Sequence, residues 1–306
     1  MKKILTVFMS LVMLISVGFV GCNKTKEEDN DAWKEDGVLK VLAIGNSFAE
    51  DTFGHIAKIS EAMGVTDYKF TIAMFGGCSL KMHYNFAINE TETYWYQCYE
   101  DGKDYYISNN YDVKLSYFVE EENWDFITVQ QGMLDECRFT LPETYSELSP
   151  LVNWIKERCP GAKIGFNCTW ADTLQSNCPE LFDLHNGNQL SMYQGIIDTI
   201  KEVVEPLDTI DFIVPNMTAL QNARTSYLTD KDDLSRDGLH LSLGIGRYIA
   251  GLTYFQKITG ISVENIEWYP EDYELDTVDL YEYYIALESV KNAFANPYEV
   301  TQSIYV

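Results

Sequence analysis

The chain contains five short apolar runs of strand length, at positions 38–44, 68–74, 125–130, 162–168 and 211–214. Each is bounded by polar residues or by turn-forming glycines and prolines. The first run leads into Gly45-Asn46-Ser47, and the second into Phe75-Gly76-Gly77-Cys78-Ser79. The pattern therefore predicts five strands, several of which end in polar or glycine-rich turns.

The segments between these runs carry apolar residues at helical spacing. In the first of them the spacing is set by Phe53, Ile56 and Met63, and Gly64 can end the helix in the left-handed conformation. Strands that alternate with helices of this length predict a parallel sheet with helices on both faces. We therefore expect an α/β fold, with three α/β/α layers around a central, mostly parallel five-stranded sheet. Helices are expected at 52–63, 80–88, 141–158, 189–204, 217–223, 244–257 and 278–295.

Positions 80–123 interrupt the alternation of strands and helices. Residues 94–117 are rich in Tyr and Asp, with turn signals at Asp101-Gly102 and Asn109-Asn110. We predict an insertion after the second strand that contains a hairpin. Its aromatic side chains suit either packing or stacking on sugars. No repeat or linker divides residues 37–306, so one domain with this insertion is expected.

The first 36 residues have a different character. A basic start and an apolar run precede Gly21-Cys22, which predicts a signal peptide over residues 1–21. A cysteine directly after a small residue at the end of such a run resembles a bacterial lipoprotein signal, so Cys22 is the expected lipidation site. Ordinary secretion is the alternative. Residues 22–36 are predicted to form a flexible tether. Its acidic run, Glu27-Glu28-Asp29, resembles the segment that sends lipoproteins to the outer cell surface, although it also suits a plain linker.

The net charge restricts the classes of binding partner, and the cysteine spacing restricts the metal and disulfide sites. The formal net charge is −25, which argues against nucleic acids and anionic polymers. Contact with a membrane is expected only through the N-terminal lipid anchor, at the bacterial outer membrane or cell surface. Six cysteines follow Cys22 without a C-x-x-C pair, so no zinc site is expected, and the disulfide pairing stays open. No cofactor is expected.

Ser47 stands at the carboxyl end of the first strand, where ligands bind in open α/β sheets. A serine nucleophile needs a base within hydrogen-bond reach. Of the four histidines, His240 has an aspartate three residues before it, Asp237. In a loop this spacing lets the carboxylate orient the imidazole while the other ring nitrogen faces the serine. Alternatively, Asp237-Gly238 is a plain turn and His240 a loop residue.

Four stretches in this order resemble the SGNH (GDSL-type) serine hydrolase superfamily: Gly45-Asn46-Ser47, Gly77-x-Ser79, Gln130-Gln131-Gly132 and Asp237-x-x-His240. The resemblance covers about residues 38–260. It implies a triad of Ser47, His240 and Asp237, and an oxyanion hole that includes the backbone N–H groups of Ser47 and Gly77. Further stretches at Thr169-Trp170, Gln221-Asn-Ala-Arg224 and Asp237-Gly-Leu-His-Leu-Ser are similar to a branch described only as an SGNH-like domain of unknown function in bacterial lipoproteins.

The sequence departs from the family pattern in two places. The first block has Asn46 where the family has Asp, and the third block has Leu134 where the family has the Asn that completes the oxyanion hole. A side-chain amide can replace that donor, and Gln131 is the expected substitute, with Gln130 as the alternative. Substrate contacts are expected from Gln130, Trp170 and Arg224, although Trp170 also suits packing and Arg224 a helix surface.

The sequence thus predicts an exported serine esterase that removes small acyl groups, above all acetyl, from carbohydrates. The substrate class comes from the resemblance and the expected compartment alone. Two alternatives stay open: a lipid or short-chain carboxylester hydrolase with the same triad, and a glycan-binding lipoprotein without catalysis.

Overall fold

The computed structural model describes Trp33 and residues 37–100, 103–107, 112–132, 140–172, 183–228, 234–272 and 276–306, with only the backbone described for 103–107. Among these residues no helix is both long enough and apolar enough to cross a membrane. The predicted signal peptide and Cys22 lie outside the described residues. Trp33 falls within the predicted tether, yet only 8% of its surface is exposed and it packs on the core.

A seven-stranded sheet in the order β4-β3-β2-β1-β5-β6-β7 forms the centre of the described part of the molecule. The five strands from β2 to β7 are parallel, as predicted, and the apolar runs supply all of them. The chain first adds a strand on one side of β1 and later strands on the other, so the strand order reverses at β1. The strands are β1 (Leu39–Gly45), β2 (Tyr68–Met74), β3 (Trp95–Glu100), β4 (Lys103–Ile107), β5 (Phe126–Val129), β6 (Lys163–Asn167) and β7 (Phe212–Val214).

The predicted insertion contains the hairpin. Strands β3 and β4 pair antiparallel with each other, and β3 pairs antiparallel with β2, so the hairpin extends the sheet beyond the predicted five strands. Tyr94 and Phe118 from this region are buried, and their rings make an edge contact. These two aromatic side chains therefore pack in the core and are not placed to stack on sugars.

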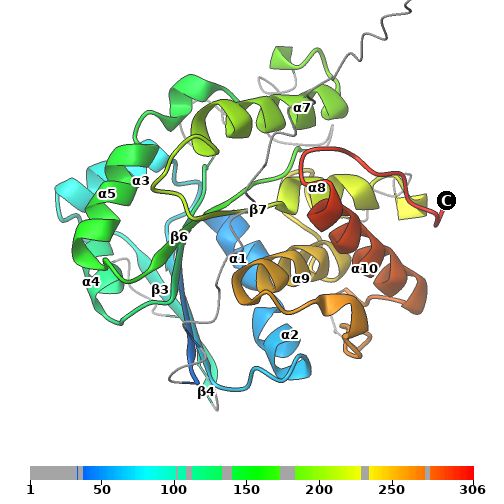
Figure 1. Cartoon of the computed structure of the whole chain (residues 1–306), viewed down its shortest axis with the longest axis horizontal. Helices are drawn as coiled ribbons and strands as arrows, with labels where there is room; N and C mark the ends of the chain where they lie inside the picture. The colour runs from blue at the N-terminus through cyan, green and yellow to red at the C-terminus, as the bar shows by residue number, and fades with distance from the viewer. Residues whose placement is uncertain are drawn as a thin grey trace, which may run out of the picture.

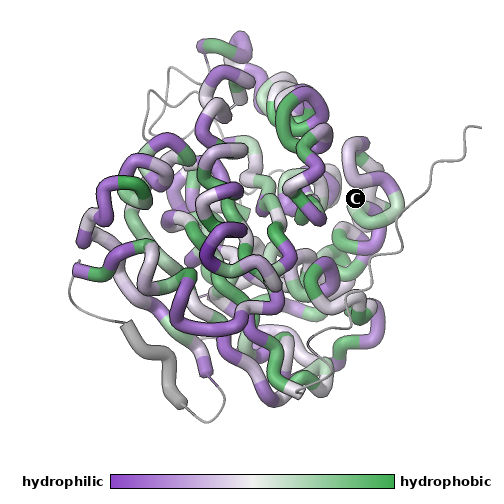
Figure 2. Tube along the Cα trace, turned by 60° about the vertical axis from the view of Figure 1, so that its left-hand side comes forward, coloured by the Kyte–Doolittle hydropathy of each residue, from purple (hydrophilic) through white to green (hydrophobic). Residues whose placement is uncertain are grey.

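Helices cover both faces of the sheet (Figure 1). Figure 2 shows the hydrophobic stretches gathered along the inner strands and the inner sides of these helices. The three-layer α/β/α prediction is confirmed. One layer contains α1 (Ser47–Phe53), α2 (Ile56–Ala62), α8 (Asn216–Ala223), α9 (Ile245–Thr259) and α10 (Leu280–Ala295), and the other α3 (Leu80–Ile88), α4 (Leu115–Glu120), α5 (Leu148–Arg158) and α7 (Gln189–Thr199), which continues as the π-helical turn η3 (Ile200–Val204).

The predicted helix 52–63 begins earlier than expected and is broken in the middle. The helix starts at Ser47 because the Asn46 side chain caps it, accepting a hydrogen bond from Phe48 N. It breaks at Gly54, where a Cβ atom would lie 2.6 Å from Arg247 Cδ, and His55 is the N-cap of the second helix. The early start places Ser47 in the first turn of α1, at the positive end of the helix dipole.

Candidate active site

Ser47 lies at the point where the strand order reverses. It directly follows β1, whose neighbours β2 and β5 were added on opposite sides. In open α/β sheets this reversal opens a crevice at the carboxyl ends of the strands. The Ser47 side chain is half-buried there, at the start of α1. Ser47 therefore has a backbone fixed by β1 and α1 and a side chain that is still partly exposed.

His240 and Asp237 meet Ser47 from the far end of the sequence. His240 Nε2 lies 2.8 Å from Ser47 Oγ, and His240 Nδ1 lies 2.7 Å from Asp237 Oδ2. With the proton on Nδ1 donated to the carboxylate, Nε2 accepts the hydrogen bond of the serine hydroxyl. This is the geometry that a serine nucleophile, its base and an orienting acid require. Residues 193 positions apart are thus joined in one hydrogen-bonded chain.

Asp237 also shapes the loop that presents the histidine. Its Oδ1 accepts hydrogen bonds from the backbone N–H groups of Leu239 and His240, at 3.0 and 2.7 Å. Partial burial raises the pKa of Asp237, but the bond from the His240 side chain and the two backbone bonds outweigh it, so the pKa lies below its usual value. Asp237 is therefore a carboxylate at neutral pH, and it can stabilise an imidazolium.

A buried carboxylate, Asp51, fastens this loop to the serine helix. Its Oδ2 accepts from Leu241 N at 2.9 Å, and its Oδ1 accepts from Arg236 Nη1 at 2.8 Å and from Arg247 Nε at 2.9 Å. Asp51 is fully buried and stands one helical turn after Ser47. Because Leu241 follows the histidine directly, these bonds fix the distance between the side chains of Ser47 and His240.

Trp170 supports the same loop from the other side. Its Nε1–H donates to Leu239 O at 2.8 Å, and its ring packs edge-on against Phe48 with 4.9 Å between the centroids. Only 1% of the Trp170 surface is exposed. The predicted substrate contact by Trp170 is therefore wrong in this structure, since the ring is sealed beneath the loop that carries His240.

Three turns come together beside Ser47. Phe75 N donates to Gly45 O at 3.1 Å, and the Asn46 side chain donates to Cys78 O at 3.0 Å. Gly132 fits so closely that a Cβ atom there would lie 2.0 Å from Cys78 O. Gly77 lies between the two anchored residues with φ of 67°, a conformation that favours glycine. Its N–H and that of Ser47 donate to no acceptor among the described residues.

The amide side chain at position 46 is required by this arrangement. Asn46 Nδ2 donates to Cys78 O, while its Oδ1 accepts from Phe48 N and from Gln130 Nε2. An ionised aspartate could accept these bonds but could not donate to a carbonyl. The Asn at this position, where the SGNH pattern has Asp, therefore has a structural reason: the Asn46 amide joins the serine turn to the Gly77 turn.

The two glutamines serve the same framework and are not placed as the sequence predicted. Gln131 Oε1 accepts from Leu80 N, and its Nε2 donates to Thr144 O at 2.7 Å. Gln130 donates to Asn46 and accepts from Asn167 Nδ2. Both are buried, with 1% and 2% of their surfaces exposed. The predicted roles of Gln131 as third oxyanion donor and of Gln130 as a substrate contact are therefore wrong; Leu134 lies outside the described residues.

Arg224 holds the end of α8 near the site. Its Nη1 donates to Ala171 O at 2.8 Å, one residue after Trp170. The side chain is half-buried, so contact with substrate stays a prediction. The other histidines take no part in the site. His83, expected to line a cleft, is fully buried against Tyr94, and burial lowers its pKa to about 3.

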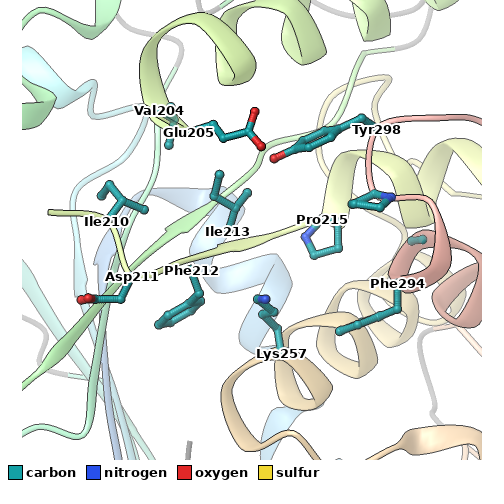
Figure 3. A pocket seen from close by; sticks show the side chains of 12 residues that line it. Val204, Glu205, Ile210, Asp211, Phe212, Ile213, Pro215, Lys257, Phe294 and Tyr298 are labelled. Atoms are coloured by element: carbon teal, nitrogen blue, oxygen red, sulfur yellow. The ribbon is translucent and has the colours of Figure 1, made fainter. Parts of the chain in front are cut away.

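Three other kinds of feature could hold a site: a metal-binding cluster, a thiol and a cavity. No group of three His, Cys, Asp or Glu side chains within them could hold a metal ion. The described cysteines Cys78, Cys98, Cys159 and Cys168 are buried and form no disulfide with one another; Cys137 and Cys178 lie outside the described residues. A cavity of about 300 Å³ opens along the free edge of β7, between Glu205, Tyr298 and Lys257 (Figure 3). None of the predicted site residues lines it.

Sequence reasoning missed two residues that build the site, Asp51 and Arg236, and it gave no separate role to Gly132 of the third block. Asp51 lies one helical turn after the serine and Arg236 directly before Asp237, so closeness to the predicted triad along the chain was the signal that could have found them. Glu50, also on α1, is half-buried close to Arg247, and burial raises its pKa. No local pattern shows that a carboxylate near position 50 pairs with arginines nearly two hundred residues away.

The fold and the hydrogen-bonded side chains define a three-layer α/β/α protein with a Ser-His-Asp arrangement at the switch point of its sheet. Residues 40–291 match the family described as Domain of unknown function (DUF4886), and the chain belongs to this family. A solved DUF4886 family protein from Bacteroides uniformis is 32% identical, with a TM-score of 0.78 over 87% of this chain and 98% of that chain. No curated protein matches the chain.

More distant solved structures are also similar to this chain. A GDSL-like lipase from Parabacteroides merdae is 14% identical, with a TM-score of 0.43 over 72% of this chain and 95% of that chain. A carbohydrate esterase family 3 protein from Talaromyces cellulolyticus is 12% identical, with a TM-score of 0.42 over 73% of this chain and all of that chain.

Proposed function

We propose that this protein is an exported serine esterase that removes small acyl groups, acetyl foremost, from carbohydrates. The observation that carries the proposal is the chain of hydrogen bonds from Ser47 Oγ to His240 Nε2 and from His240 Nδ1 to Asp237 Oδ2. A serine that is linked to a neutral imidazole is activated for attack on an ester carbonyl.

The proposed reaction has two halves. Ser47 Oγ attacks the carbonyl carbon while His240 Nε2 takes the hydroxyl proton, and Asp237 stabilises the resulting imidazolium. The backbone N–H groups of Ser47 and Gly77 are the proposed donors to the oxyanion. The imidazolium then gives its proton to the leaving alcohol, leaving the acyl group on the serine. Water, deprotonated by the same histidine, releases the acid and restores Ser47.

Hydrolysis of p-nitrophenyl acetate tests the reaction. The wild-type chain is expected to turn over this ester, and Ser47→Ala is expected to reduce turnover to the rate without enzyme. A fluorophosphonate should label the wild type at Ser47, as mapped by mass spectrometry. Equal rates for wild type and variant, with no label on Ser47, would leave the chain as a non-catalytic glycan-binding protein.

The carbohydrate part of the proposal needs its own comparison. Acetate release from acetylated xylan should exceed the hydrolysis of longer-chain p-nitrophenyl esters at equal ester concentration. The opposite order would favour a lipid or short-chain carboxylester hydrolase. Export and lipid attachment at Cys22 are also part of the proposal. They predict that bacterial cells expressing the protein incorporate labelled palmitate into the wild-type chain but not into the Cys22→Ala variant.

A further inference from the structure

A continuous array of tyrosine rings lies on the surface where the C-terminal tail meets the start of α10. The tail runs back along this helix, so the chain end lies beside it (Figure 1). Ile304 N donates to Glu288 Oε1, and Tyr227 N donates to Tyr305 O, which hold the tail in place. The array comprises Tyr227, Tyr281, Tyr305, Tyr284, Tyr283 and Tyr269, with neighbouring centroids 5.0 to 6.5 Å apart.

The middle of the array is open to solvent. Tyr281 and Tyr284 are 44% and 45% exposed, although they project from a helix whose other face is buried in the core. Neither hydroxyl forms a hydrogen bond with any described residue. Large aromatic rings with free hydroxyls in contiguous exposed positions are typical of a binding surface, since they bury much apolar area with little loss of side-chain entropy.

The charges around the array restrict what can bind. Asp279 caps α10, Glu282 stands in its first turn, and Glu288 binds the tail. These carboxylates and the net charge of −25 repel nucleic acids, uronate-containing polymers and anionic lipid headgroups. A second copy of the chain is also disfavoured, because a two-fold contact would set the same carboxylates against each other.

We propose that this tyrosine array binds a neutral polysaccharide chain. The C–H faces of successive sugar rings would pack on the tyrosine faces, whose electron density attracts weakly positive C–H groups. The sugar hydroxyls would bond to the tyrosine hydroxyls and to the flanking carboxylates. This binding does not involve Ser47, so it stands or falls independently of ester hydrolysis.

Affinity electrophoresis tests the proposal with the full chain bearing Ser47→Ala, which prevents any cleavage of the probe. Native gels containing mixed-linkage β-glucan or acetylated xylan should retard this chain, and gels containing polygalacturonate should not. Adding Tyr281→Ala and Tyr284→Ala should weaken retardation by the neutral polysaccharides by about tenfold or more. Tyr117→Ala is the matched control, because that exposed tyrosine lies on α4 outside the array.

Two further measurements separate this surface from the catalytic one. In a Ser47 background, the double tyrosine variant should hydrolyse p-nitrophenyl acetate within about twofold of the wild type, with an unchanged circular dichroism spectrum. The proposal is overturned if neither neutral polysaccharide retards the chain or if the double variant is retarded equally. Sedimentation that reveals a dimer abolished by the double substitution would assign the surface to a second copy instead.

Discussion

The carboxylate of Asp51 accepts a hydrogen bond from the backbone N–H of Leu241, with 2.9 Å between Oδ2 and N. The first residue stands one helical turn after Ser47, and the second directly follows His240. A single buried acid therefore couples the proposed nucleophile and its base, which come from opposite ends of the domain. The distance between the Ser47 and His240 side chains therefore depends on the hydrogen bonds of Asp51.

Asp51→Asn tests that coupling. The amide removes the buried charge that Arg236 and Arg247 both contact, so we expect the free energy of unfolding to fall by about 3 kcal/mol. Displacement of His240 should lower kcat by up to roughly 10²-fold. Urea unfolding and p-nitrophenyl acetate kinetics measure both effects. Glu61→Gln is the control, since it removes an exposed carboxylate paired with Lys58 and should change stability by less than about 1 kcal/mol. Equal behaviour of the two variants would contradict the role of Asp51.

Asp237→Asn separates orientation of the histidine from folding of its loop. Asparagine keeps an oxygen for the backbone N–H groups of Leu239 and His240 but replaces the acceptor of the Nδ1 proton with an amide. We expect kcat to fall by roughly 10⁴-fold, as the same change does in a serine protease triad, while the melting temperature stays close to that of the wild type. A kcat within tenfold of the wild type would remove Asp237 from the proposed triad.

Gly132→Ala tests the close contact between turns. The new methyl group would lie 2.0 Å from Cys78 O and 2.6 Å from Asn46 Nδ2, so the Gly77 turn must move. We expect a loss of stability of about 3 kcal/mol from overpacking and a loss of roughly 10²-fold in kcat as one oxyanion donor is displaced. Gly161→Ala meets no atom within 4 Å and serves as the control in the same thermal and kinetic measurements. A fully active, stable Gly132→Ala chain would show that the turns are not interlocked.

Trp170→Phe distinguishes support of the loop from contact with substrate. Phenylalanine fills most of the buried space but cannot donate to Leu239 O. The lost bond should lower the free energy of unfolding by about 1 kcal/mol and reduce kcat, with KM for acetylated xylan unchanged within about twofold. Trp154→Phe, on α5, controls for the loss of an indole elsewhere. A raised KM with unchanged kcat and stability would restore Trp170 as a substrate contact.

His55 predicts a pH dependence of stability. Burial lowers its pKa from 6.5 to about 4, and its Nε2–H donates to Leu243 O at 2.7 Å. Between these pH values the unfolded chain takes up a proton that the folded chain does not. The neutral, buried His55 therefore contributes to the stability of the folded chain. This contribution is complete above pH 6.5 and is lost as the pH falls towards 4. Between pH 7 and pH 5, the free energy of unfolding measured in urea should fall by about 2 kcal/mol more in the wild type than in His55→Gln. Equal losses would mean that the folded chain protonates this histidine.

Much of the molecule follows from local patterns in the sequence. The five apolar runs form the five parallel strands, because a strand buried on both faces requires a continuous run of apolar residues, which is a local pattern. The Gly77 turn was also visible, since a glycine pair after a strand favours positive φ. The choice of His240 among four histidines depended on its spacing of three residues from Asp237 together with the family resemblance, since the spacing alone also suits a plain turn.

Only the tertiary structure decided which hydrogen-bond partners the buried polar side chains of the site have. The sequence offered Gln131 as an oxyanion donor and Trp170 as a substrate contact, but neighbouring turns take up the hydrogen bonds of both side chains. It gave no sign that Asp51 binds Arg236, because the two are 185 residues apart. A buried polar group must find a partner wherever the fold brings one near. That partner is set by the packing of distant segments, which no local period or spacing encodes.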